Sequence, residues 1–140
     1  MKKLRIFVSF DYECDRQYKY LLNCWNNQAN IPFCFEDGSS DEIQSSDISV
    51  VKRALSAKIH QADYVLVIVG EDANRLHPDH KKIGERNWQN YEIATAKAWR
   101  IPLIAVQLKS SYSYPEELIG VNAKRCYDFS LESISKAIWR

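Results

Sequence analysis

The chain contains 140 residues, of which 46% are hydrophobic and 26% charged, and its formal net charge is +1. This composition predicts one folded domain over residues 1–140 and excludes a disordered chain, while the balanced charge argues against nucleic-acid binding. The apolar runs have only strand length, so we expect no membrane span and no membrane partner. The four cysteines lack CxxC spacing and indicate reduced thiols, which fits a cytoplasmic protein.

Predicted strands and helices alternate along the chain. Strands are expected at residues 4–10, 32–36, 62–69 and 101–106, with a short fifth strand within residues 124–129. Helices are expected at about residues 15–27, from Ser46 to about Gln61, at residues 87–99 and after Ser130, with Ser46 and Ser130 as N-caps. Hydrophobic strands separated by helices are typical of a parallel sheet covered on both faces. The sequence therefore predicts an α/β fold, namely a flavodoxin-like three-layer sandwich with a parallel sheet of about five strands.

Each predicted helix carries an inward-facing stripe at helical spacing. Glu92 interrupts the stripe of the helix at residues 87–99, and a carboxylate in such a place costs free energy unless something compensates it. It could lie at the edge of the stripe and pair with Arg86 or Lys97, or it could be a site residue, and the pattern alone leaves both open. In chain order, the expected inward residues are Tyr18, Leu21, Leu22 and Trp25, then Ile48, Val51, Leu55 and Ile59, then Trp88, Tyr91, Thr95, Ala96 and Trp99, and finally Leu131, Ile134 and Ile138.

In sheets of this kind, ligands bind beyond the carboxyl ends of the strands, where the strand order reverses. For a flavodoxin-like order that point lies between the first and third strands, so residues 9–12 and 70–72 should meet there. The helix bearing Glu92 follows the third strand and can reach the same crevice. Residues 71–86 form an unusually long connection, and residues 37–46 are polar, so we expect both segments to be loops. Either loop could cover the crevice, or it could be a surface insertion without a role. This convergence favours a functional Glu92.

Four segments in the right order resemble TIR-like domains: Ile6-Phe-Val-Ser-Phe-Asp11, Ala62-Asp-Tyr-Val-Leu-Val-Ile-Val-Gly70, Trp88-Gln-Asn-Tyr-Glu92 and Arg100-Ile-Pro-Leu-Ile-Ala-Val106. More narrowly, Ser9-Phe-Asp-Tyr12 with Asp15-Arg16, and Asn87-Trp88 before Tyr91-Glu92, resemble the compact TIR-like proteins of Thoeris anti-phage defence. The resemblance spans most of the domain. The short second strand and the loop after it depart from adaptor TIR domains, which weakens any transfer of loop residues.

The resemblance implies an enzyme. Enzymatic TIR domains cleave the N-glycosidic bond of NAD, release nicotinamide, and hydrolyse or cyclise the ADP-ribose part. Thoeris-type proteins make a cyclic ADP-ribose-type signal that activates a separate effector protein. Glu92 matches the catalytic glutamate of the family. NAD would then be the substrate, with no further cofactor and no metal, and self-association or a trigger would raise the activity.

The residues fit that chemistry. Loss of nicotinamide leaves an oxocarbenium-like ribose, which a carboxylate such as Glu92 stabilises, and nicotinamide leaves without a strong general acid. Phe10 and Trp88 could stack on a substrate ring or pack in the core. Asp11 could hydrogen-bond a ribose or an amide, or cap the first helix. The remaining substrate-binding candidates are Ser9, Ser45 and Ser46.

Other interpretations compete with this one. A TIR scaffold without activity would act by assembly alone. A receiver domain shares the expected fold and would use Asp11, Glu13 and Asp15 as an acidic Mg²⁺ pocket. Against this interpretation, no lysine lies directly at the end of the following strand. A flavodoxin lacks support, because no Ser/Thr-Gly phosphate loop follows the first strand. His77 and His80 could bind a metal, although such a pair beside two lysines more often forms a solvated turn.

Overall fold

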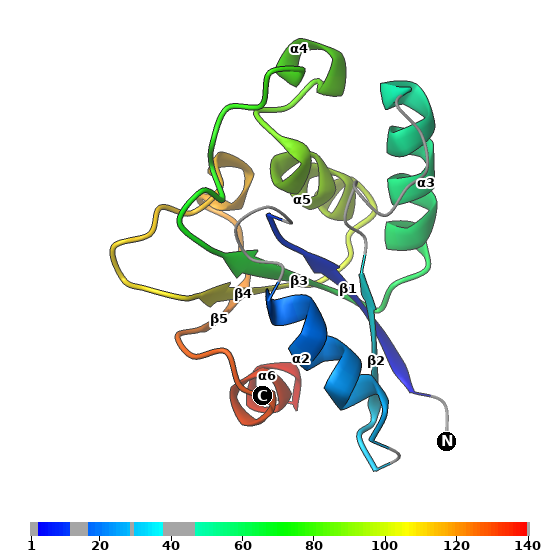
Figure 1. The fold of residues 1–140 in the computed structure, drawn as a ribbon, viewed down its shortest axis with the longest axis vertical. Helices are drawn as coiled ribbons and strands as arrows, with labels where there is room; N and C mark the ends of the chain where they lie inside the picture. The colour runs from blue at the N-terminus through cyan, green and yellow to red at the C-terminus, as the bar shows by residue number, and fades with distance from the viewer. Residues whose placement is uncertain (1–2, 12–16, 29, 38–46, 140) are drawn as a thin grey trace.

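A single parallel sheet organises the molecule (Figure 1). The structure is a computed structural model that describes residues 3–11, 17–28, 30–37 and 47–139. The strands run in the order β2-β1-β3-β4-β5, and every neighbouring pair is parallel. The predicted flavodoxin-like order is therefore confirmed. The strands are β1 (Leu4–Ser9), β2 (Phe33–Asp37), β3 (Tyr64–Val69), β4 (Leu103–Gln107) and β5 (Lys124–Cys126).

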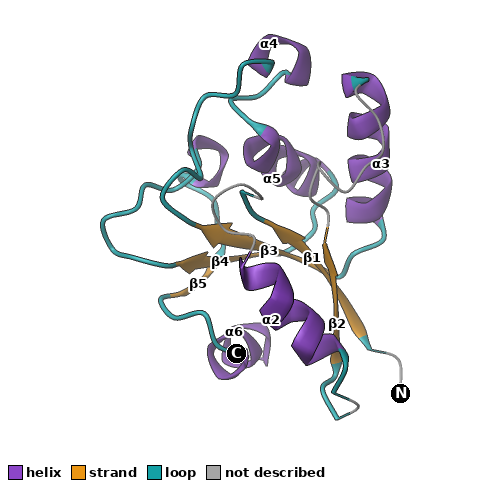
Figure 2. Ribbon diagram, viewed as in Figure 1, coloured by secondary structure: helices purple, strands orange, loops and turns teal. Residues whose placement is uncertain are grey.

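Helices cover both faces of this sheet (Figure 2). Helices α2 (Gln17–Asn26) and α6 (Leu131–Trp139) lie on one face, and helices α3 (Ile48–His60) and α5 (Trp88–Ala98) lie on the other. Two short elements, α4 (His80–Ile83) and the 3₁₀ turn η2 (Glu116–Leu118), sit in the connections that precede α5 and β5. Among the described residues, no helix has the length and apolar character that a membrane crossing needs.

The alternation of side chains along β1 divides the core into two layers, because successive residues of a strand point to opposite faces. Ile6 and Val8 join the cluster under α2 and α6, whereas Phe7 joins the cluster under α3 and α5. Continuing this alternation places Ser9 on the face of α5 and Phe10 on the face of α2. Phe10 is indeed a member of the α2 and α6 cluster.

Two residues that were predicted to face inward are exposed instead. In α2, Leu22 is buried and Trp25 packs against the core, but Leu21 is 43% exposed because it is turned about 100° away from Leu22. Trp99 follows the last residue of α5 and is 54% exposed, with its ring against His60 at a centroid distance of 4.3 Å. Both predictions were wrong. Most predicted inward residues of α3 and α6 are buried, namely Val51, Leu55, Ile59, Ile134 and Ile138, whereas Ile48 is only half-buried.

Several boundaries also differ from the expected ones. The predicted loop at residues 37–46 begins later, because Asp37 is the last residue of β2 and pairs with Val8. The N-cap of α3 is Asp47, whose carboxylate accepts a hydrogen bond from the Ser49 backbone at 2.9 Å. Ser45 and Ser46 lie outside the described residues. The predicted cap Ser130 is confirmed, since its hydroxyl oxygen accepts from the Ser133 backbone at 3.1 Å.

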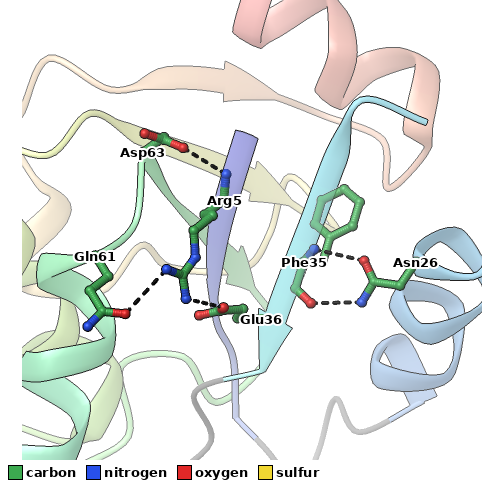
Figure 3. A network of polar contacts seen from close by, with 6 residues as sticks. All are labelled: Arg5, Asn26, Phe35, Glu36, Gln61 and Asp63. Carbon is green, nitrogen blue, oxygen red and sulfur yellow. Dashed lines mark hydrogen bonds and ion pairs between the residues drawn. The ribbon is translucent and has the colours of Figure 1, made fainter. Parts of the chain in front are cut away.

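Polar contacts tie the edge strand β2 to its surroundings (Figure 3). The guanidinium of Arg5 in β1 pairs with Glu36 in β2, and its backbone N–H donates to Asp63 ahead of β3 at 2.8 Å. On the outer side of β2, the Asn26 amide contacts the backbone of Phe35 twice. Its oxygen accepts from the Phe35 N–H and its nitrogen donates to the Phe35 carbonyl, both at 2.8 Å.

Candidate functional site

Glu92 lies in the middle of the buried face of α5. It is 2% exposed, and it shares that face with Gln89, Ile93 and Ala96. The sequence predicted an inward stripe of Trp88, Tyr91, Thr95, Ala96 and Trp99 with Glu92 in its middle. Glu92 is indeed buried, but Trp88 and Tyr91 are only half-buried, so the buried face is centred about one position further around the helix.

The carboxylate is held by the end of β1. The Ser9 hydroxyl donates a hydrogen bond to Glu92 Oε1 at 2.6 Å, and both residues are buried. The expected alternative partners contact other groups: Arg86 Nε donates to the Asn74 carbonyl, and Lys97 contacts the backbone and side chain of Glu117. Two predicted site residues that lie 83 positions apart are thus brought into direct contact. A hydrogen bond donated by a hydroxyl fixes the orientation of the carboxylate that accepts it.

Gln89, one helical turn before Glu92, is a buried polar residue that the sequence did not single out. Its side-chain amide donates to two backbone carbonyls, that of Ser9 at 3.2 Å and that of Ile68 at 3.0 Å. These carbonyls lie near the carboxyl ends of β1 and β3, the two strands that flank the switch point. The spacing of three residues from Glu92 was the available signal, since it places both side chains on one helix face.

An ion-paired arginine joins the two segments that follow these strands. Arg75 contacts the carboxylate of Asp11 at 3.5 Å and that of Asp72 at 3.6 Å. Asp11 follows β1 and Asp72 follows β3, so the segments expected to meet at the switch point do meet there. The predicted role of Asp11 towards a ribose or amide remains a prediction, and its observed partner is Arg75.

The two aromatic candidates occupy different places. Phe10 is 5% exposed and packs with Leu22 and other residues of the α2 and α6 cluster, on the face of the sheet opposite Glu92. Trp88 packs against the cluster of α3 and α5, on the same face as Glu92. It is half-buried, and its ring meets those of His77 and Tyr91 edge-on at 6.4 and 5.8 Å. The structure therefore places Trp88, and not Phe10, on the side of the catalytic candidate.

The long connection before α5 is anchored by Asn87, the N-cap of that helix. Its side-chain oxygen accepts from the Asn90 backbone at 2.9 Å. Its side-chain nitrogen donates to the carbonyls of Ala73 at 2.9 Å and Arg75 at 2.8 Å. The predicted loop at residues 71–86 is therefore an ordered segment with a short helix of its own, α4, and it is fixed to the start of the helix that bears Glu92.

Two further asparagines extend these contacts to the connection between β4 and β5. Asn90 is fully buried, and its side-chain oxygen accepts from the Glu117 backbone at 2.9 Å. Asn74 accepts from the Asn90 amide at 3.2 Å and from the Glu116 backbone at 2.9 Å. Sequence reasoning missed this set, because asparagines in predicted loops and helix starts are usually solvated.

Metal binding at the two histidines has little support. His77 Nδ1 accepts a hydrogen bond from the Asp79 backbone at 2.9 Å, so one ligand nitrogen is already engaged. In the part of the chain that the structure describes, no group of three or more His, Cys, Asp or Glu side chains could hold a metal ion. For the receiver-like alternative, Glu13 and Asp15 lie outside the described residues.

The fold and the site together define a class, a doubly wound α/β domain with a buried glutamate on the helix that follows the third strand. A crystal structure of a prokaryotic SEFIR domain has the same fold, with a TM-score of 0.53 and 16% sequence identity over 98% of this chain and 94% of that chain. No curated protein matches the chain. The family described as Thoeris protein ThsB, TIR-like domain, matches residues 7–113. The chain belongs to this family of Thoeris anti-phage defence, which confirms the resemblance seen in the sequence.

Proposed function

We propose that this protein cleaves NAD at the bond between nicotinamide and ribose and converts the rest into a cyclic ADP-ribose-type signal that activates a separate effector. The observation that carries the proposal is the buried contact between Ser9 and Glu92 at the switch point of a ThsB-type TIR-like domain. Ligands of doubly wound sheets bind at this edge. An acidic group that is buried and oriented there is better suited to chemistry than to stabilising the fold, because its burial costs free energy.

The chemistry follows from where charge develops. As the bond between ribose C1′ and the nicotinamide nitrogen breaks, its electron pair moves to nitrogen and neutralises the pyridinium, leaving positive charge on the ribose. The Glu92 carboxylate stabilises that charge, and it can also accept a hydrogen bond from a ribose hydroxyl. Water or a nitrogen of the adenine then attacks C1′. The partly exposed ring of Trp88 provides a surface on which a base can stack.

The burial of Glu92 has a further implication for activity. A carboxylate that is 2% exposed cannot contact a sugar until its surroundings move. The free protein should therefore have low activity, and a trigger or self-association would shift it towards an open, competent state. This supports the expectation that the activity is switched on during infection.

The proposal is tested by comparing Glu92→Gln with Glu85→Gln, a matched change on the connection just before α5. In phage-challenged cells, where the trigger is present, wild type and Glu85→Gln should release nicotinamide from NAD, whereas Glu92→Gln should release none. Purified Glu92→Gln should keep the circular dichroism spectrum of the wild type. Protein-free filtrates of phage-challenged cells should contain a new ADP-ribose-derived nucleotide that activates a candidate effector, and this nucleotide should be missing with Glu92→Gln. If filtrates of wild type and Glu92→Gln are the same by mass spectrometry and by effector activation, the enzymatic function is refuted and a scaffold role replaces it.

A further inference from the structure

Gln89 occupies an unusual position for a neutral polar residue. It is 4% exposed on the inward face of α5, where an apolar side chain would pack without needing partners. Its side-chain amide nitrogen donates hydrogen bonds to two backbone carbonyls, those of Ser9 and Ile68. An amide nitrogen carries two hydrogens, so it can serve both acceptors at once.

The two carbonyls lie where strand pairing ends. The last pair between β1 and β3 joins Ser9 to Val67; β1 ends there, and beyond it β3 continues to Val69 beside β4 alone. Buried carbonyls at such a point need a donor, because leaving them without a hydrogen bond costs free energy. Gln89 supplies that donor from the helix. It therefore attaches α5 to the ends of both strands at the switch point.

Ser9 is consequently held at two points by one helix face. Its carbonyl accepts from Gln89, and its hydroxyl donates to Glu92 one turn further along. The first contact fixes the backbone from which the Ser9 side chain projects. The direction of the hydroxyl, and with it the orientation of the Glu92 carboxylate, depends on that backbone.

We propose that Gln89 is a positioning residue: by fixing the backbone of Ser9, it aims the hydroxyl that orients the Glu92 carboxylate. The inference deepens the proposed function, since its kinetic consequence rests on Glu92 being the catalytic group. Gln89 would contact neither substrate nor the reacting atoms. A misoriented carboxylate lowers the rate of the chemical step more than the binding of substrate, because its contribution is realised in the transition state.

The test uses Gln89→Met, which keeps an unbranched side chain of similar length and removes the donors. Gln107→Met is the matched control. Gln107 is the last residue of β4, and its side-chain amide also donates a hydrogen bond to a backbone carbonyl, that of Tyr112, at 2.9 Å. In crystal structures we expect the contact between Ser9 and Glu92 to be lost in Gln89→Met and kept in Gln107→Met. We expect kcat for NAD to fall about tenfold in Gln89→Met with KM within twofold, and both to be unchanged in Gln107→Met.

A double-mutant cycle separates positioning from general stability. If Gln89 acts through the Ser9 hydroxyl, Gln89→Met should have almost no further effect on kcat in a Ser9→Ala background. An equal loss in both backgrounds, or a Gln89→Met structure that keeps the contact of Ser9 with Glu92, would overturn the inference. Should Gln89→Met fail to fold, Gln89→Glu is measured in the same way. If filtrates of phage-challenged cells with wild type and with Glu92→Gln are the same, the proposed function fails and the crystal structures alone decide the role of Gln89.

Discussion

Substitution of Asn87 by alanine should destabilise the connection that precedes α5. The change removes the N-cap, which is worth about 1 kcal/mol, and two hydrogen bonds to the carbonyls of Ala73 and Arg75. Each of these bonds contributes roughly 0.5–1 kcal/mol, because they are partly exposed to solvent. The sum is a loss of about 2–3 kcal/mol, equivalent to a decrease in Tm of roughly 6–12 °C.

Asn87→Asp separates the two contributions, since a carboxylate still caps the helix but cannot donate to the carbonyls. Urea denaturation of wild type and both variants measures the differences in free energy of unfolding. We expect both variants to be destabilised, because the carboxylate of Asn87→Asp would face the carbonyls of Ala73 and Arg75 without a hydrogen to donate. If Asn87→Ala and Asn87→Asp both lie within about 0.5 kcal/mol of wild type, the anchoring role assigned to Asn87 is refuted.

Three further substitutions test the structure at other points. Phe10→Ala should cost about 3–5 kcal/mol of stability because the ring is buried, and a variant that melts like wild type but has lost NAD cleavage would instead support a stacking role. Burial first, and then the nearby carboxylate of Glu117, raises the pKa of the Glu85 carboxyl. The protonated carboxyl therefore stabilises the fold relative to the ionised one at acid pH, and this stabilisation is lost as the pH rises through the raised pKa. Glu85→Gln should therefore raise Tm at pH 7, by an amount that shrinks towards pH 4, and a gain that does not depend on pH would contradict this. Tyr91→Phe removes a hydroxyl that contacts α3 at 2.8 and 3.1 Å and should cost about 1 kcal/mol in thermal unfolding, while an unchanged Tm would mean that these contacts contribute nothing.

The order of strands and helices was predictable because it depends on local patterns. The hydrophobic runs that became β3 and β4 are too apolar for a half-exposed sheet, and the only compact arrangement is a parallel sheet between two helix layers. Glu92 was predictable for a related reason, since a carboxylate among apolar residues at helical spacing is conspicuous. The face of α5 was predicted one position away because the large rings of Trp88 and Tyr91 dominate the pattern, although rings of that size are often only half-buried.

The parts that could not be predicted depend on contacts between distant segments. Gln89 is a polar residue of the kind that usually faces solvent. Its amide has two acceptors, the carbonyls of Ser9 and Ile68, only because β1 and β3 meet under α5. Phe10 could have been placed correctly, because the period of two along β1 puts it on the face opposite Ser9. The asparagine contacts around Asn90 required the fold itself, since they join the connections before α5 and before β5.

Asn26 has a consequence for how copies of this protein can associate. Its side-chain amide has the same donor and acceptor arrangement as a peptide group, so it pairs with Phe35 as one residue of a neighbouring strand would. Phe35 is the middle residue of the edge strand β2, the place where an incoming strand of another molecule would have to make its central hydrogen bonds. A sixth strand could be added here only after the amide is displaced. Association of this domain at this edge should therefore proceed through side-chain surfaces and not through the hydrogen bonds of the backbone.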